Sequence, residues 1–157
     1  MERIKPNLAS SKELPVFTQS LYIAGCIPFL ILGLLHTIYT IADTYNPKRI
    51  VPYEPGVMGL MKDSTLALTK ETDMWRAWVG FNISHGVGVL FFAITLLYLA
   101  VLHIAFLQSS LFLLIASPLV ALVYLLLSRK YWFRIPAAGS AIGLLCFLTG
   151  SLAQAFA

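Results

Sequence analysis

The stretch "AWVGFNISHGVGVLFFAITLLYLAVLHIAFLQSSLFLLIASPLVALVYLLL" (residues 77–127) decides the fold, because its 51 residues include no Lys, Arg, Asp or Glu. A membrane-spanning helix needs about 20 apolar residues. As a single helix the stretch would be about 76 Å long, at a rise of about 1.5 Å per residue. It therefore predicts two antiparallel membrane helices, with the chain turning near Gln108-Ser109-Ser110.

Two more apolar runs, residues 18–42 and 135–157, are each long enough for one span. All the charged side chains lie outside these runs and outside 77–127. Only 11% of the 157 residues are charged, against about 25% in soluble domains. We expect an all-α fold, a four-transmembrane-helix bundle forming a single integral membrane domain over residues 1–157. The predicted spans are 18–42, 77–104, 110–127 and 135–156, with one longer loop between the first two.

The distribution of basic residues predicts the orientation, since Lys and Arg mark cytoplasmic loops. Segments 43–76 and 128–134 contain eight of the eleven Lys and Arg residues, and the N-terminal tail contains the other three. We expect both segments to be cytoplasmic and both termini to be outside, although the basic tail leaves the opposite orientation open. The net charge of +4 reflects this topology, and nothing indicates nucleic-acid binding.

The segment between the first two spans has two parts. Three prolines in "NPKRIVPYEPG" (46–56) argue against a regular helix there. "VMGLMKDSTLALT" (57–69) mixes apolar and polar residues, which fits either an amphipathic helix at the membrane interface or an ordinary surface loop. Thr72 or Asp73 is a candidate N-cap for the second span. The predicted aromatic anchors at the interface are Trp75, Trp78 and Trp132.

Small residues predict where helices approach closely, as small-xxx-small patterns do in membranes. One stripe begins with Gly139 and Gly143 in the fourth span. Another consists of Gly80, Ser84 and Gly88 in the second span. The two cysteines lie inside predicted spans with no disulfide or metal-binding spacing, so no metal site is expected.

Two histidines are predicted to meet inside the membrane. His36 lies about seven residues before the end of the first span, and His85 about ten residues after the second begins, so both lie roughly 10–15 Å from the same membrane face. Buried polar groups in lipid need partners. The candidates for an internal polar pocket are His36, Tyr39, Thr40, Asp43, Arg76, Asn82 and His85.

Each of these residues also has a simpler interpretation. The polar groups could form a hydrogen-bonded lock between two helices, with no ligand at all. Arg76 could equally lie at the headgroup level and bind lipid phosphate.

The elements "GLLHTIYT" (33–40) and "WRAWVGFNISHGVG" (75–88) resemble those of an uncharacterised family of small bacterial four-helix integral membrane proteins. The family shares a Leu-His-x-x-Tyr-Thr element and a Trp-Arg-Ala-Trp-x-Gly-Phe-Asn-x-Ser-His element. The resemblance covers roughly residues 30 to 90 and implies a bacterial inner (plasma) membrane protein. It also implies that these matched side chains share one site: His36, Tyr39, Trp75, Arg76, Trp78, Asn82 and His85. No established activity can be carried over from this family, and the cofactor is unknown.

Three classes of function remain open. The first is a membrane protein or accessory subunit of a larger membrane complex that binds a lipid, quinone or other apolar ligand. The second is a membrane enzyme, an isomerase or oxidoreductase, that uses His36 or His85 as acid or base on a lipidic substrate. The architecture is also weakly similar to that of sterol-isomerase-like membrane proteins. Those proteins use acidic residues inside their helices, whereas this chain has only Asp43 at a helix end, so the similarity gives the enzyme class little support. The third is haem binding through both histidines.

Overall fold

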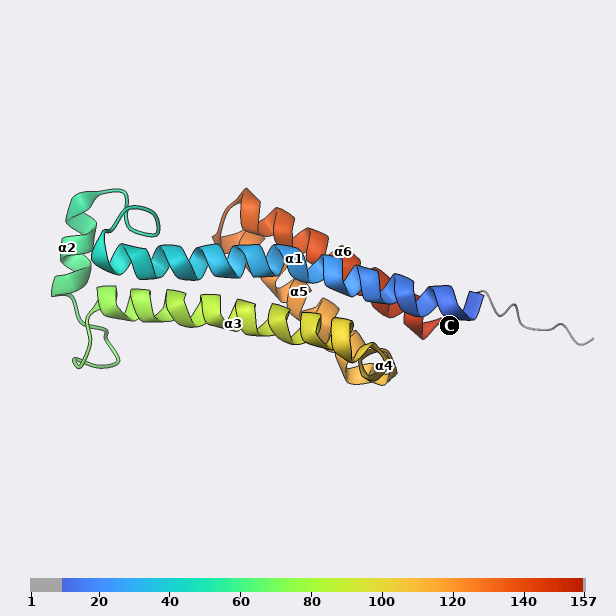
Figure 1. The fold of residues 1–157 in the computed structure, drawn as a ribbon. Helices are drawn as coiled ribbons and strands as arrows, with labels where there is room; N and C mark the ends of the chain where they lie inside the picture. The colour runs from blue at the N-terminus through green and yellow to red at the C-terminus, as the bar shows by residue number, and fades with distance from the viewer. Residues whose placement is uncertain (1–9, 157) are drawn as a thin grey trace, which may run out of the picture. The chain divides into compact units, whose positions relative to one another are not determined.

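The computed structural model describes residues 10–156, without the side chains of residues 10–15 and 55. Over this range the chain is helical and contains no strand, only an isolated bridge between Thr65 and Asp73. The helices are α1 (Ser10–Tyr45), α2 (Pro55–Asp63), α3 (Met74–Leu102), α4 (Ile104–Ser109), α5 (Leu111–Tyr131) and α6 (Arg134–Ala155) (Figure 1). The predicted all-α fold class is confirmed.

Four of these helices are long and apolar enough to cross a membrane, in agreement with the four predicted spans. The spanning segments are Val16–Tyr45, Met74–Leu102, Leu111–Tyr131 and Arg134–Ala155. Each extends beyond its predicted limits at one end or both, because polar residues such as Thr44 and Arg129 continue the helix. The second span ends at Leu102, two residues earlier than expected.

The turn between α3 and α5 also begins earlier than Gln108-Ser109-Ser110. His103 leaves the helical conformation, with φ −136° and ψ 41°, and the short helix α4 follows it. The Nε2 atom of His103 lies 3.1 Å from the hydroxyl of Tyr98. The serines mark only the far end of the turn, where the Ser110 hydroxyl accepts a hydrogen bond from the backbone N–H of Leu113 at 3.4 Å and caps α5.

Part of the segment between α1 and α3 is helical, which fits the amphipathic-helix interpretation of residues 57–69 better than the surface-loop interpretation. Helix α2 begins at Pro55 and ends at Asp63, so it is shorter than residues 57–69 and starts earlier. Proline fits this first position because the N–H that it lacks would have no helical partner there. Asp73 is the N-cap of α3, since its carboxylate accepts the backbone N–H of Arg76 at 2.7 Å.

The described chain divides into two compact units. One unit contains the residues up to Leu30 and from Phe92 onward, and its core is aromatic. The rings of Phe29 and Phe147 stack at 6.1 Å between centroids, and Phe92 packs edge-on against Phe147 at 5.9 Å. Gly143 of the predicted stripe lies directly against the Phe29 ring, so a side chain there would collide with it.

A buried hydroxyl cluster links three helices of the same unit. The hydroxyl of Tyr22 in α1 lies 2.9 Å from the Ser117 hydroxyl in α5 and 2.8 Å from the Ser151 hydroxyl in α6. Ser117 in turn donates to the backbone carbonyl of Leu113 at 2.7 Å. Because buried polar groups in a bilayer need partners within the protein, this cluster fixes the helices in one register.

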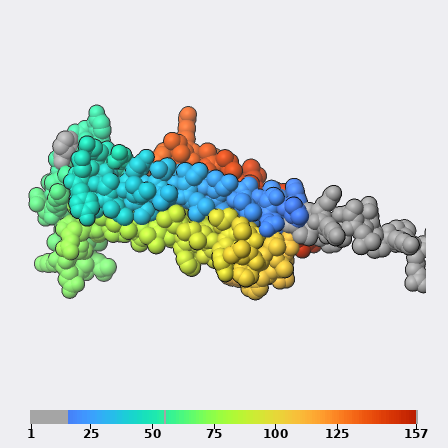
Figure 2. Space-filling model, viewed as in Figure 1, coloured from blue at the N-terminus to red at the C-terminus, as the bar shows by residue number. Residues whose placement is uncertain are grey.

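The second unit, Ile31–Phe91, contains the later half of α1, α2 and the first half of α3. In the space-filling view the cyan part of α1 and the green part of α3 lie side by side (Figure 2). Gly33 packs against Val89, with 3.0 Å between an added Cβ and the nearest Val89 methyl carbon. Gly86 packs against Thr37, whose backbone nitrogen would lie 3.3 Å from an added Cβ.

The stripe of Gly80, Ser84 and Gly88 does not form the packing contact that was expected within the described chain. A Cβ added at Gly80 or Gly88 meets no atom of the described chain within 4 Å. The buried face of α3 contains instead Asn82, Gly86 and Val89, spaced three and four residues apart. Positions 80, 84 and 88 therefore lie on another side of the helix.

We expect Gly86→Leu to destabilise the protein by about 1–3 kcal/mol, because overpacking a tight contact costs about that much. Gly88→Leu is the matched control, since it adds the same side chain two residues away in open space. Equilibrium unfolding in mixed detergent micelles measures both. Equal stability of the two variants would contradict the α1–α3 packing described here.

Candidate functional site

The structure brings His36 of α1 and His85 of α3 into contact. Their ring centroids lie 5.3 Å apart, and the rings are nearly perpendicular at 81°. Both side chains are half-buried. The ring of Phe81, one turn before His85, stacks on the His85 ring at 6.4 Å and 12°. The pair thus has an aromatic neighbour on α3.

Asn82 completes this group, which we call the histidine pair site (His36, Asn82 and His85). Asn82 is 7% exposed and lies beside the His36 ring. Its side-chain amide donates to the backbone carbonyl of Trp78 at 2.8 Å. The Nε2 atom of His36 is buried and has no hydrogen-bond partner within the described part of the chain. It is the one fully buried side-chain nitrogen or oxygen of the site that lacks such a partner among the described residues.

Thr40 and Asp43 are buried, as the spacing of their helix face suggested, but they form other contacts. The Thr40 hydroxyl donates to the carbonyl of His36 at 2.8 Å. The Asp43 carboxylate accepts the backbone N–H groups of three successive loop residues, Lys48 and Arg49 at 3.0 Å each and also Ile50. Asp43 therefore holds the loop that follows α1.

Tyr39 also faces this loop. The guanidinium carbon of Arg49 lies 4.7 Å from the centroid of the Tyr39 ring. The indole N–H of Trp78 donates to the carbonyl of Ile50 at 3.2 Å. The loop is thus fastened to α1 through Tyr39 and Asp43 and to α3 through Trp78.

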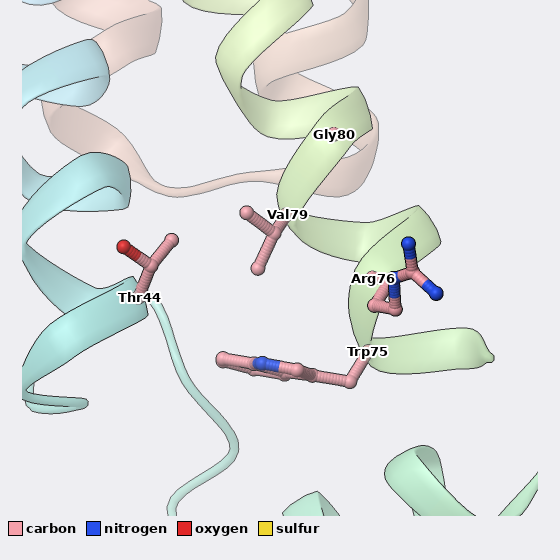
Figure 3. Close-up of a pocket in the computed structure, with 5 residues that line it drawn as sticks. All are labelled: Thr44, Trp75, Arg76, Val79 and Gly80. Carbon is pink, nitrogen blue, oxygen red and sulfur yellow. The ribbon is translucent and has the colours of Figure 1, made fainter. Parts of the chain in front are cut away.

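Arg76 and Trp75 line a separate open cavity of about 350 Å³, together with Thr44, Val79 and Gly80. Trp75 and Val79 point from α3 toward Thr44 of α1, whereas the guanidinium of Arg76 points away from Thr44 (Figure 3). This position is compatible with the headgroup level, which is one of the two roles that the sequence indicates equally for Arg76. Neither histidine lines the cavity.

The last predicted anchor, Trp132, is at the end of α5. It is 40% exposed, and its backbone N–H donates to the carbonyl of Ser128 at 3.2 Å. Six of the seven pocket candidates therefore separate into three groups in the structure: the histidine pair site, the loop contacts of Tyr39 and Asp43, and the cavity beside Arg76. Thr40 bonds only within its own helix.

A second cavity, of about 550 Å³, was not expected from the sequence. Lys48 and Arg49 line it with two prolines and the side chains of Val51, Tyr53 and Met58. The signal in the sequence was the basic pair inside the proline-rich "NPKRIVPYEPG". The backbone conformation of Lys48 and Arg49 depends on their hydrogen bonds to Asp43. The spacing of residues along the chain does not reveal these hydrogen bonds.

No group of three or more His, Cys, Asp or Glu side chains is placed to hold a metal ion among residues whose side chains are described. Comparisons with protein-family models, with curated proteins and with solved structures found no match to the chain. The resemblance to the bacterial membrane protein family stays a prediction. The function must be argued from the site itself.

We expect Asp43→Asn to loosen the loop of residues 46–50, because the neutral amide has only one acceptor oxygen for three N–H donors. Hydrogen bonds to charged groups contribute about 1.5–3 kcal/mol each. The backbone amides of Lys48, Arg49 and Ile50 should therefore exchange with deuterium at least about tenfold faster.

The matched control is Asp63→Asn at the exposed end of α2, which removes the same charge without these contacts. Unchanged exchange at residues 48–50 in Asp43→Asn would show that other contacts hold the loop.

Proposed function

We propose that this chain is an integral protein of the bacterial inner membrane that binds a lipid or quinone at the histidine pair site, with segments 43–76 and 128–134 in the cytoplasm. The polar group of the ligand, a carbonyl or hydroxyl oxygen, would bond to Nε2 of His36. One observation carries the proposal: this nitrogen is buried and receives no hydrogen bond of normal geometry from the described residues, although the side chain and backbone of Asn82 lie close to the ring. An unpaired polar group in the hydrocarbon region costs several kcal/mol, and a ligand oxygen would remove that cost.

The surroundings of the pair support an apolar ligand. Phe81 is 68% exposed, and its ring stacks in parallel on the His85 ring. The apolar part of a lipid or quinone could lie along this aromatic face while its oxygen reaches His36. The two cavities near the loops are lined by other residues. Because Nε2 is fully buried, binding requires neighbouring side chains to move so that the ligand oxygen reaches it from the lipid-facing surface of the α1–α3 pair.

Asn82 has a positioning role in this proposal. Its amide N–H₂ is tied to the Trp78 carbonyl, which fixes the orientation of the amide beside His36. A fixed neighbour limits the ring positions that His36 can adopt, so Nε2 stays directed at one place. The same residue could serve a structural lock, and the experiment below separates the two.

The enzyme alternative has less support. Thr40 and Asp43 are both bonded to backbone groups elsewhere, so neither of them orients the histidines for acid–base chemistry. Haem binding also fits less well. Two metal–nitrogen bonds of about 2 Å on opposite sides of one ion put ring centroids about 6 Å apart, and the histidine rings are only 5.3 Å apart.

Mass spectrometry of small molecules that co-purify with the protein in mild detergent tests the proposal. We expect the wild-type protein to retain a specific lipid or quinone, and His36→Phe to retain about tenfold less, because losing the partner of a buried polar group costs about 1–3 kcal/mol. His103→Phe is the matched control, because it removes a histidine outside the pair whose ring contacts the hydroxyl of Tyr98. An absorption spectrum of the same sample detects haem if it is present.

Stability measurements distinguish a ligand site from a lock. Adding the identified molecule should raise the unfolding temperature of wild type and of His103→Phe, but not of His36→Phe. If His36→Phe is merely less stable and still retains the molecule, or if wild type retains none, the histidines form a structural lock.

A further inference from the structure

The 550 Å³ cavity beside the end of α1 combines two cations with apolar walls. Lys48 and Arg49 are exposed and line the cavity together. The nearby carboxylate of Asp43 is 2% exposed and bonded to backbone N–H groups. Asp43 also interacts electrostatically with Arg49, so two cations beside one buried carboxylate leave a net positive charge at the cavity.

The loop is held so that these cations stay in place. Asp43 accepts the backbone N–H groups of Lys48 and Arg49 themselves, which fixes the main chain at both residues. Trp78 holds the next residue through the Ile50 carbonyl. A site fixed in this way loses less conformational entropy when it binds a ligand.

Arg49 is positioned further by its contact with Tyr39. Its guanidinium carbon lies 4.7 Å from the ring centroid, which is cation–π distance. An arginine bound through the face of its guanidinium keeps its N–H edges available. Those edges match a phosphate group, which arginine binds through two parallel hydrogen bonds.

The position along the chain indicates which phosphate. The spanning segment ends at Tyr45, three residues before Lys48. Tyr45 and Tyr53 are 87% and 97% exposed, as aromatic residues at a membrane interface commonly are. In a bilayer the cavity would lie at the level of the lipid headgroups, with Val51 and Met58 available to the glycerol and upper acyl chain.

We propose that this cavity binds the phosphate of an anionic phospholipid through Arg49 and Lys48. The interaction is independent of the histidine pair site, because it uses different residues and a different part of the ligand. It also agrees with the predicted cytoplasmic orientation, since anionic lipids concentrate in that leaflet. Tyr39 and Asp43 act as positioning residues for the two cations.

Native mass spectrometry after reconstitution into phosphatidylcholine nanodiscs with a minority of phosphatidylglycerol tests the proposal. Wild type should retain phosphatidylglycerol above its share of the bilayer. Two basic residues near the surface together contribute enough for at least about a tenfold preference. Lys48→Ala/Arg49→Ala should lose this enrichment. Lys62→Ala/Lys70→Ala, which removes the same charge from exposed positions outside the cavity, should keep it.

Two further variants and a competitor complete the design. Arg49→Lys keeps the charge but not the planar guanidinium, and Tyr39→Leu removes the ring, so both should reduce the enrichment without changing net charge. Equal enrichment in both double variants would overturn the proposal, as would equal loss, because a general electrostatic effect would then explain retention. Displacement of phosphatidylglycerol by millimolar inorganic phosphate would assign the site to a soluble phosphate instead.

Discussion

The hydrocarbon layer of a membrane contains no water to bond with polar groups, and the described structure is arranged around this constraint. The backbone satisfies it by forming helices. Side chains satisfy it within their own helix where they can, as when Thr37 donates to the carbonyl of Gly33 at 2.8 Å. Tyr22 satisfies it between helices, through Ser117 and Ser151. The polar contacts thus set which helix faces meet.

Among the described side chains, two buried polar atoms lack a partner, Thr18 Oγ1 and His36 Nε2. The two atoms differ in how easily each can gain a hydrogen-bond partner. A threonine hydroxyl can rotate toward a carbonyl of its own helix. An imidazole nitrogen lies at the far end of a rigid ring and needs a partner from elsewhere. For this reason Nε2 of His36, rather than the Thr18 hydroxyl, is the proposed ligand-binding atom.

Polar groups near the loop serve a second purpose, which is to shape the surface. Asp43 fixes the main chain of Lys48 and Arg49, and Tyr39 supports the Arg49 guanidinium. The same unit therefore contains an apolar-facing histidine site and a basic cavity at the loop. The histidine pair site lies between two apolar spans and suits an apolar ligand. The basic cavity follows the end of a span and suits an anionic group.

By itself the sequence determined the helices that can span a membrane, because span length and the exclusion of charge are properties of consecutive residues. It also indicated that Thr40, Asp43 and Asn82 lie on buried faces, since helical periodicity is local. Only the tertiary structure decided which polar groups pair. Asp43 bonds to backbone groups of the following loop, Tyr39 stacks with Arg49, and Gly86 rather than Gly88 meets α1. Those outcomes depend on the path of the loop and the rotation of each helix about its axis, which the spacing of residues along one helix does not define.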